Sequence, residues 1–152
     1  SVSNQALSSK PFLIAINLHG NALQSLPEAA FANSNKLKSL QLQNNQLKTI
    51  GANTFYSVPA LKDLYLQNNH LNTLAGNVFH ELGNLIILNL ENNHLTSLDV
   101  SAFHGLGNLA DLYLEKNALK ELPGGVFSPL VKLQTLTLND NLLTQLPANL
   151  FQ

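Results

Sequence analysis

The sequence predicts an α/β solenoid, with a curved parallel β-sheet on its concave side and short irregular segments on its convex side. One observation is a pattern, L-x-x-L-x-L-x-x-N-x-L, which is clearest at residues 61–71 and returns every 24 residues along almost the whole chain. Another is that no residue has to be inserted or skipped to keep this period. The register divides the single domain, 1–152, into a leading segment and six repeats: 1–12, 13–36, 37–60, 61–84, 85–108, 109–132 and 133–152.

Each repeat is predicted to contain one short strand. In the third repeat, Leu64 and Leu66 alternate with Asp63, Tyr65 and Gln67, which is the period of two expected for a strand with one buried face. A unit of 24 residues cannot enclose that face alone, so neighbouring repeats must stack. Their strands are then expected to pair in parallel, ~4.8 Å apart.

Two further columns of identical residues predict how the repeats hold together. Asparagine fills the ninth position of every repeat, where its carboxamide can both donate to and accept from backbone groups that the strand leaves unpaired. Phenylalanine fills the nineteenth position, where stacked rings would form a spine on the outer side of the core. The columns are Asn21, Asn45, Asn69, Asn93, Asn117 and Asn141, and Phe31, Phe55, Phe79, Phe103, Phe127 and Phe151.

At these positions the sequence resembles the leucine-rich repeat family, in particular the 24-residue repeats of extracellular animal proteins. The copy from Leu109 to Lys132, LADLYLEKNALKELPGGVFSPLVK, is most similar to repeats of the variable lymphocyte receptors of jawless vertebrates and their amphioxus relatives. Ectodomains of the Toll-like receptor and Slit types are similar as well. The resemblance covers residues 13–152 and implies a horseshoe whose concave sheet binds a ligand, without naming that ligand.

The chain contains no cysteine, although extracellular members of this family usually close the array with disulfide-bonded caps. Either the chain is a fragment or it is capped differently. The absence of cysteine would also fit a cytosolic protein. Cytosolic repeats, however, are commonly longer and helical, unlike the LPGGVF segment at residues 122–127. We therefore expect an extracellular protein, either secreted or the ectodomain of a cell-surface protein.

The two ends of the array differ from its middle. Residues 1–12 lie outside the register and form either a cover over the edge of the first repeat or a disordered tail. The sixth repeat stops soon after Phe151, so its leucines are expected to be partly open to solvent. This predicts either a missing C-terminal cap or a homodimer formed through this end.

Charge is sparse and unevenly distributed. Charged residues make up 11% of the chain, and lysine supplies every positive charge. Residues 1–76 hold five lysines and two acids, net +3, whereas residues 77–152 hold three lysines and seven acids, net −4. No basic stripe is present, so the expectation is that nucleic acid is not a partner. The sequence contains no run of 18 apolar residues, so no membrane span is predicted. The lack of a signal peptide or initiating Met suggests a mature or trimmed product.

The outward strand positions vary between repeats, as a recognition surface would. The strongest candidate site centres on Tyr65 and Tyr113, two repeats and so ~10 Å apart, because tyrosine combines contact area with a hydroxyl. Acidic neighbours favour a ligand with hydrogen-bond donors, such as a glycan or a modestly basic protein surface. Alternatively, the tyrosines only cover leucines on a solvated sheet. The candidate ligand-binding residues are Lys62, Asp63, Tyr65, Gln67, Ile87, Asn89, Glu91, Asp111, Tyr113 and Glu115.

Neither a catalytic centre nor a cofactor is predicted. No nucleophile elbow, phosphate-binding glycine loop or zinc-protease motif is present. Two histidine pairs, His70 with His94 and His80 with His104, share repeat positions and are expected within ~5 Å of each other. Two imidazoles without a third ligand make a poor zinc site, so no metal is predicted. Protonation of a close pair near pH ~6 is a milder possibility.

The sequence therefore favours a non-catalytic, immune-receptor-like recognition module that binds a microbial surface component, a glycan or a protein, on its concave face. The alternative is a structural or adhesion module whose partner is a protein, including a second copy of the chain. An intracellular scaffold is a third possibility.

Overall fold

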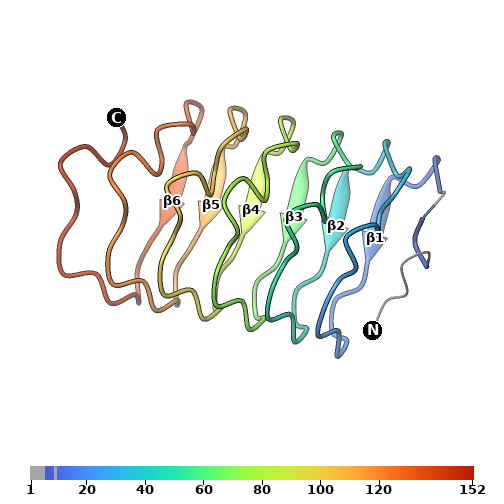
Figure 1. Cartoon of the computed structure of the whole chain (residues 1–152), viewed down its shortest axis with the longest axis horizontal. Helices are drawn as coiled ribbons and strands as arrows, with labels where there is room; N and C mark the ends of the chain where they lie inside the picture. Colours follow the sequence, from blue (N-terminus) through green and yellow to red (C-terminus); the bar gives the residue numbers. More distant parts are fainter. Residues whose placement is uncertain (1–5, 9) are drawn as a thin grey trace.

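The computed structural model describes residues 6–8 and 10–152, and these form one solenoid of coils stacked side by side (Figure 1). Each repeat contributes one strand of three residues, and the six strands form a single parallel sheet in chain order. The described residues contain no helix, and the return segments are runs of turns, which are the irregular convex segments that were predicted. The strands are β1 (Ala15–Asn17), β2 (Ser39–Gln41), β3 (Asp63–Tyr65), β4 (Ile87–Asn89), β5 (Asp111–Tyr113) and β6 (Thr135–Thr137).

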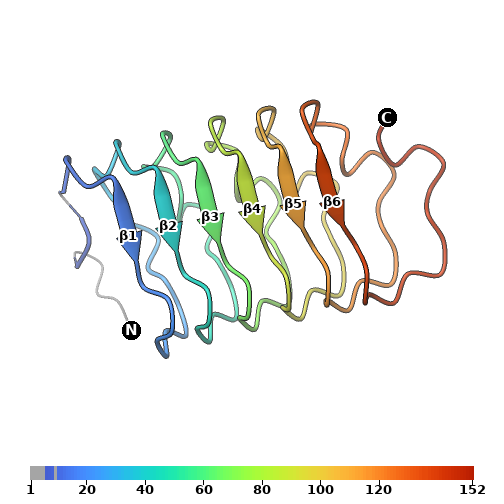
Figure 2. The same ribbon diagram turned by 180° about the vertical axis from the view of Figure 1, so that it is seen from behind.

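The strands pair without any slip in register. Each residue lies opposite the residue 24 positions further along the chain, so that Leu64 of β3 pairs with Leu88 of β4. Backbone bonds continue past the end of each strand; the N–H of Leu42, for example, donates to the carbonyl of Tyr65 over 2.9 Å. Figure 2 shows the resulting sheet, with the return segments behind it. The side chains of one repeat position therefore form a row across the sheet.

The inward row of leucines and the column of phenylalanines fill the core. Leu40, Leu64, Leu88 and Leu112 have no exposed surface, because each points between the sheet and the return segments. The rings of Phe55 and Phe79 and those of Phe103 and Phe127 stack with 5.8 Å between their centroids. The ring of Phe151 lies at the same distance from Phe127 but is tilted by 34°. The predicted spine is confirmed.

The asparagine column bonds each repeat to the one before it. Asn69 donates through Nδ2 to the carbonyl of Leu66 in its own repeat and of Leu42 in the preceding repeat, both over 3.0 Å. Its Oδ1 accepts the backbone N–H of Leu47 over 3.0 Å. The predicted double role of the carboxamide is thus confirmed, and the same bonds recur in Asn45, Asn93, Asn117 and Asn141.

A third column, which the sequence analysis missed, lies one residue before those asparagines. All six residues of this column have positive φ, between 50° and 69°, which is the left-handed conformation, and each lies three residues past the end of a strand. Asparagine tolerates this conformation better than most residues. Two of the exposed asparagines also bond to the equivalent side chain of the preceding repeat over 2.8 Å. The column is Gly20, Asn44, Asn68, Asn92, Lys116 and Asp140.

The ends of the described chain are less well covered than its middle. Leu7 packs against the core and its carbonyl accepts a long 3.5 Å bond from the Ser34 hydroxyl, whereas Phe12 is largely exposed beside Lys36. Half of the predicted leading segment, residues 1–5 and 9, lies outside the described residues, so its role stays a prediction. The leucines of the sixth repeat are partly open, as expected: Leu133, Leu136, Leu138, Leu143 and Leu146.

Candidate functional site

The outward side chains of β3, β4 and β5 form two rows, which we call the central sheet face. The first row is Asp63, Ile87 and Asp111, and the second is Tyr65, Asn89 and Tyr113; the strand register fixes both. All six side chains are half-buried, on the side of the strands opposite the core leucines. An Asp-x-Tyr unit in β3 therefore repeats in β5, with an aliphatic and an amide side chain between the two copies.

Within residues 6–8 and 10–152, neither carboxylate of this face has a hydrogen bond or an ion pair: Asp63 and Asp111 are free to bind. The hydroxyls of Tyr65 and Tyr113 have no hydrogen-bond partner there either. Partial burial, followed by the negative charge of Asp63 and then by Tyr113, raises the pKa of Tyr65 above that of a free tyrosine. The phenol of Tyr65 is thus a neutral hydrogen-bonding group at neutral pH, beside the carboxylate of Asp63.

The two glutamates of the candidate set already have partners. Glu91 accepts an ion pair from Nζ of Lys116 over 2.8 Å, and this pair raises the pKa of Lys116. Glu115 accepts a short hydrogen bond from the hydroxyl of Thr137 on the neighbouring strand. A ligand that used either carboxylate would have to displace these contacts. The expected acidic rim is therefore available mainly at Asp63 and Asp111.

The remaining candidates lie at the edges of the face. Asn89 bonds through Oδ1 to the backbone N–H of Glu91 over 2.9 Å, which fixes its orientation. Gln67 is half-buried beyond Tyr65 in the same repeat. Lys62 is exposed and lines a shallow groove beside the sheet, rather than the two central rows.

This flank groove, of about 370 Å³, was not expected from the sequence. It runs along the side where the strands begin, and it is lined by Lys62, Asn84, Ile86, Asn108, Ala110, Lys132 and Gln134. Lys132 donates to Oδ1 of Asn108 over 2.6 Å, whereas Lys62 makes no ion pair within the described part of the chain. The low overall charge of the chain gave no indication that Lys62 and Lys132 would line the same groove.

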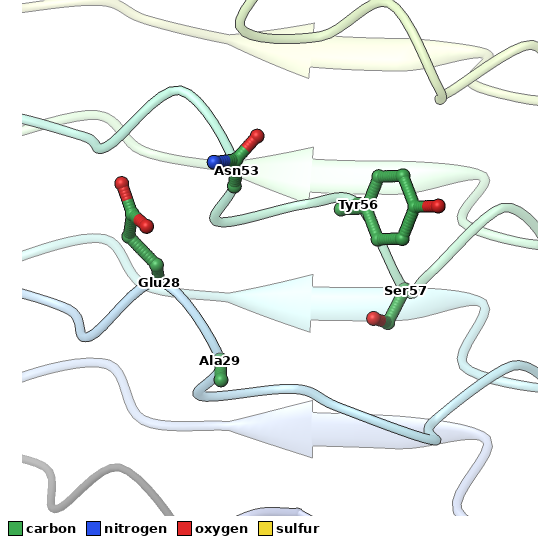
Figure 3. A pocket seen from close by; sticks show the side chains of 5 residues that line it. All are labelled: Glu28, Ala29, Asn53, Tyr56 and Ser57. Atoms are coloured by element: carbon green, nitrogen blue, oxygen red, sulfur yellow. The ribbon is translucent and has the colours of Figure 1, made fainter.

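A second hollow, of about 390 Å³, lies on the convex side of the first two repeats. Figure 3 shows it on the return segments, with the strands of the sheet behind, and its lining residues are Glu28, Ala29, Asn53, Tyr56 and Ser57. Tyr56 is mostly exposed, so this hollow is the main rival to the central sheet face. This hollow could not be predicted from the sequence because its lining residues follow no pattern that all repeats share.

The histidine pairs behave differently from one another. The rings of His70 and His94 stack with centroids 5.1 Å apart, close to the predicted separation. His80 instead bonds to the carbonyl of Asn77 over 2.7 Å and lies 3.0 Å from Glu81. Across the residues that the structure describes, no group of three or more histidine, cysteine or acidic side chains is placed to hold a metal ion.

The matches to a family model decide the classification. A model described as leucine rich repeat matches four overlapping segments, residues 11–71, 35–95, 59–119 and 83–143. The chain belongs to the leucine-rich repeat family. No curated protein sequence matches it significantly. None of its described segments forms a helix with the length and apolarity that a membrane crossing requires.

The solved structures add a relative with a nucleic-acid ligand. The leucine-rich repeat chain in the crystal structure of a TLR13-ssRNA13 complex is 31% identical, with a TM-score of 0.89 over 95% of this chain. Our chain spans only 20% of the length of that relative. The expectation that nucleic acid is not a partner is contradicted by this finding. Sparse charge was a poor ground for exclusion, since a closely similar repeat array occurs in a complex with RNA.

Proposed function

We propose that this leucine-rich repeat chain is a non-catalytic recognition module that binds its ligand on the central sheet face. The observation that carries this proposal is the pair of Asp-x-Tyr units on β3 and β5, whose carboxylates and hydroxyls have no partner within the described residues. Polar groups held on a rigid sheet but left unpaired are suited to bind a ligand, because they lose little conformational freedom on binding.

The chemistry of this face favours a ligand with hydrogen-bond donors or positive charge. A protein surface or a microbial surface component with amino groups would meet this requirement, in line with the immune-receptor-like role that the sequence suggests. The same resemblance supports an extracellular location and a relationship to variable lymphocyte receptors, both of which we retain as parts of the proposal.

Single-stranded RNA is a second candidate ligand, favoured by the similarity to the RNA-bound relative. The flank groove offers Lys62 and Lys132 for phosphates, beside amide side chains that can bond to bases or sugars. Such binding would weaken as salt concentration rises, because phosphate contacts release counterions.

The test is binding of the purified chain to a panel of bacterial surface polymers, intact cells, basic proteins and single-stranded RNA. The Tyr65→Ala/Tyr113→Ala variant reports on the central sheet face, and Tyr56→Phe on the convex hollow. Saturable binding that is lost only in the first, still-folded variant supports the proposal. Binding that survives this variant contradicts it.

The two candidates predict opposite effects of one substitution. Asp63→Asn/Asp111→Asn should weaken a ligand that donates to these carboxylates, but should strengthen or leave unchanged the binding of a polyanion. Conversely, Lys62→Gln/Lys132→Gln should weaken the binding of RNA and should leave the binding of a ligand on the central sheet face unchanged. Binding of no panel member would favour the alternative of adhesion through a specific protein partner or a second copy.

A further inference from the structure

The repetition of the Asp-x-Tyr unit defines a spacing as well as a chemistry. β3 and β5 are second neighbours in a parallel sheet, so equivalent side chains on them are ~9.6 Å apart. Along each strand, the aspartate and the tyrosine are two residues apart and lie on the same face. The face thus presents two identical pairs of polar side chains along the solenoid axis, separated by Ile87 and Asn89.

Each unit suits a guanidinium group better than an ammonium group. A carboxylate can accept two parallel N–H bonds from arginine, while the adjacent tyrosine ring can stack on the guanidinium plane. Asp63 and Asp111 form no ion pair with any residue that the structure describes, so a ligand does not have to break one there. The two glutamates of the candidate set, Glu91 and Glu115, already contact Lys116 and Thr137.

The spacing discriminates between backbone conformations of a peptide ligand. In a polyproline II helix, residues i and i+3 lie on the same side and are separated by ~9.3 Å, which matches the distance between the two units. In a β-strand, residues three apart point to opposite sides, and same-side residues are ~6.7 or ~13 Å apart. An extended strand would therefore place only one basic side chain correctly.

We propose that the central sheet face binds a polyproline II peptide segment with arginines at positions i and i+3, aligned along the solenoid axis, one guanidinium in each Asp-x-Tyr unit. The intervening residues lie over Ile87, so a proline or another apolar residue fits there. This inference rests on the proposed function and names the class of ligand for the same face.

The experiment uses three labelled peptides of identical composition, PPRPPRPP, PPRPRPPP and PPRPPPRP, whose arginines are three, two and four residues apart. Fluorescence anisotropy with the whole chain should give the tightest binding for the first peptide, by about fivefold or more over each isomer. Asp63→Asn/Asp111→Asn should weaken that peptide by about tenfold or more, whereas Glu28→Gln/Glu121→Gln, which removes the same charge elsewhere, should change it by less than about twofold.

Equal binding of the three isomers would overturn the inference, as would unchanged binding by the Asp63→Asn/Asp111→Asn variant with native circular dichroism. A chain that binds no peptide but binds another panel ligand through Tyr65 and Tyr113 disproves this inference and leaves the proposed function standing. Binding of neither, by a folded chain, disproves both.

Discussion

The two sides of the same strands have opposite properties. Inward, β2 to β5 carry one residue type, leucine, with no exposed surface. Outward, the same strands carry serine, aspartate, isoleucine, glutamine, tyrosine and asparagine. The inward positions, which are the same in these repeats, maintain the stack, whereas the outward positions differ between neighbouring repeats and carry the binding that we propose. Substitutions on the two sides should therefore affect different measurements.

The largest loss of stability should come from a substitution in the core. Phe79→Ala removes a ring that is fully buried and stacked on Phe55, and it should lower the free energy of unfolding by roughly 3 to 5 kcal/mol. Phe151→Ala is the matched control: this ring occupies the same repeat position but is 61% exposed, so its loss should cost about 1 kcal/mol. Urea denaturation measures both. Equal losses of stability in the two variants would mean that burial does not determine how much each phenylalanine of the column contributes.

The asparagine column should come next. Asn69→Ala leaves the buried N–H of Leu47 without its partner, which should cost roughly 1 to 3 kcal/mol. The carbonyls of Leu42 and Leu66 each lose one of two donors and keep the bond from Asn45 or Asn93. Asn69→Asp should cost a similar amount, because an ionised carboxylate cannot donate to those carbonyls. Thermal melting of the variants checks this. An unchanged melting temperature for either variant would refute the assigned role of the column.

The inward side could be predicted from the sequence because a period of 24 and alternating leucines leave a single way to stack the repeats. The positions of Tyr65, Tyr113, Ile87 and Asn89 on the outward face follow from the same register. The contacts of Glu91 with Lys116 and of Glu115 with Thr137 could not be predicted, since they depend on the conformations of individual side chains in adjacent repeats. The column of residues with positive φ could not be recognised in the sequence, because Gly20, Lys116 and Asp140 replace asparagine at half of its positions.

A smaller effect on stability is expected in the column of residues with positive φ. Lys116→Asn places a residue that tolerates positive φ where lysine now has φ of 54°. It also allows a bond to Asn92 like the one that Asn92 makes to Asn68. The lost ion pair with Glu91 is exposed and contributes little. The melting temperature should rise by roughly 1 to 3 °C, and a fall would show that the ion pair outweighs the backbone preference.

The smallest effect concerns the outward side alone. In the Tyr56→Phe/Tyr113→Phe background, Tyr65 should ionise above the usual pH for tyrosine, because burial and Asp63 raise its pKa. Since folding favours the neutral phenol, stability is retained below the ordinary tyrosine pKa and declines as pH rises past it.

Adding Asp63→Asn to that background should lower the pKa of Tyr65, as followed by the ultraviolet absorption of the phenolate. No change on adding Asp63→Asn would mean that the two side chains do not lie together as described.

The most direct test of the account is to map the contact surface of a bound panel ligand by nuclear magnetic resonance of backbone amides. If the ligand binds the central sheet face, the shifted signals will cluster in β3, β4 and β5, around Tyr65, Ile87 and Tyr113. Shifts that cluster instead around Glu28, Asn53 and Tyr56 would place binding in the convex hollow and contradict the central claim.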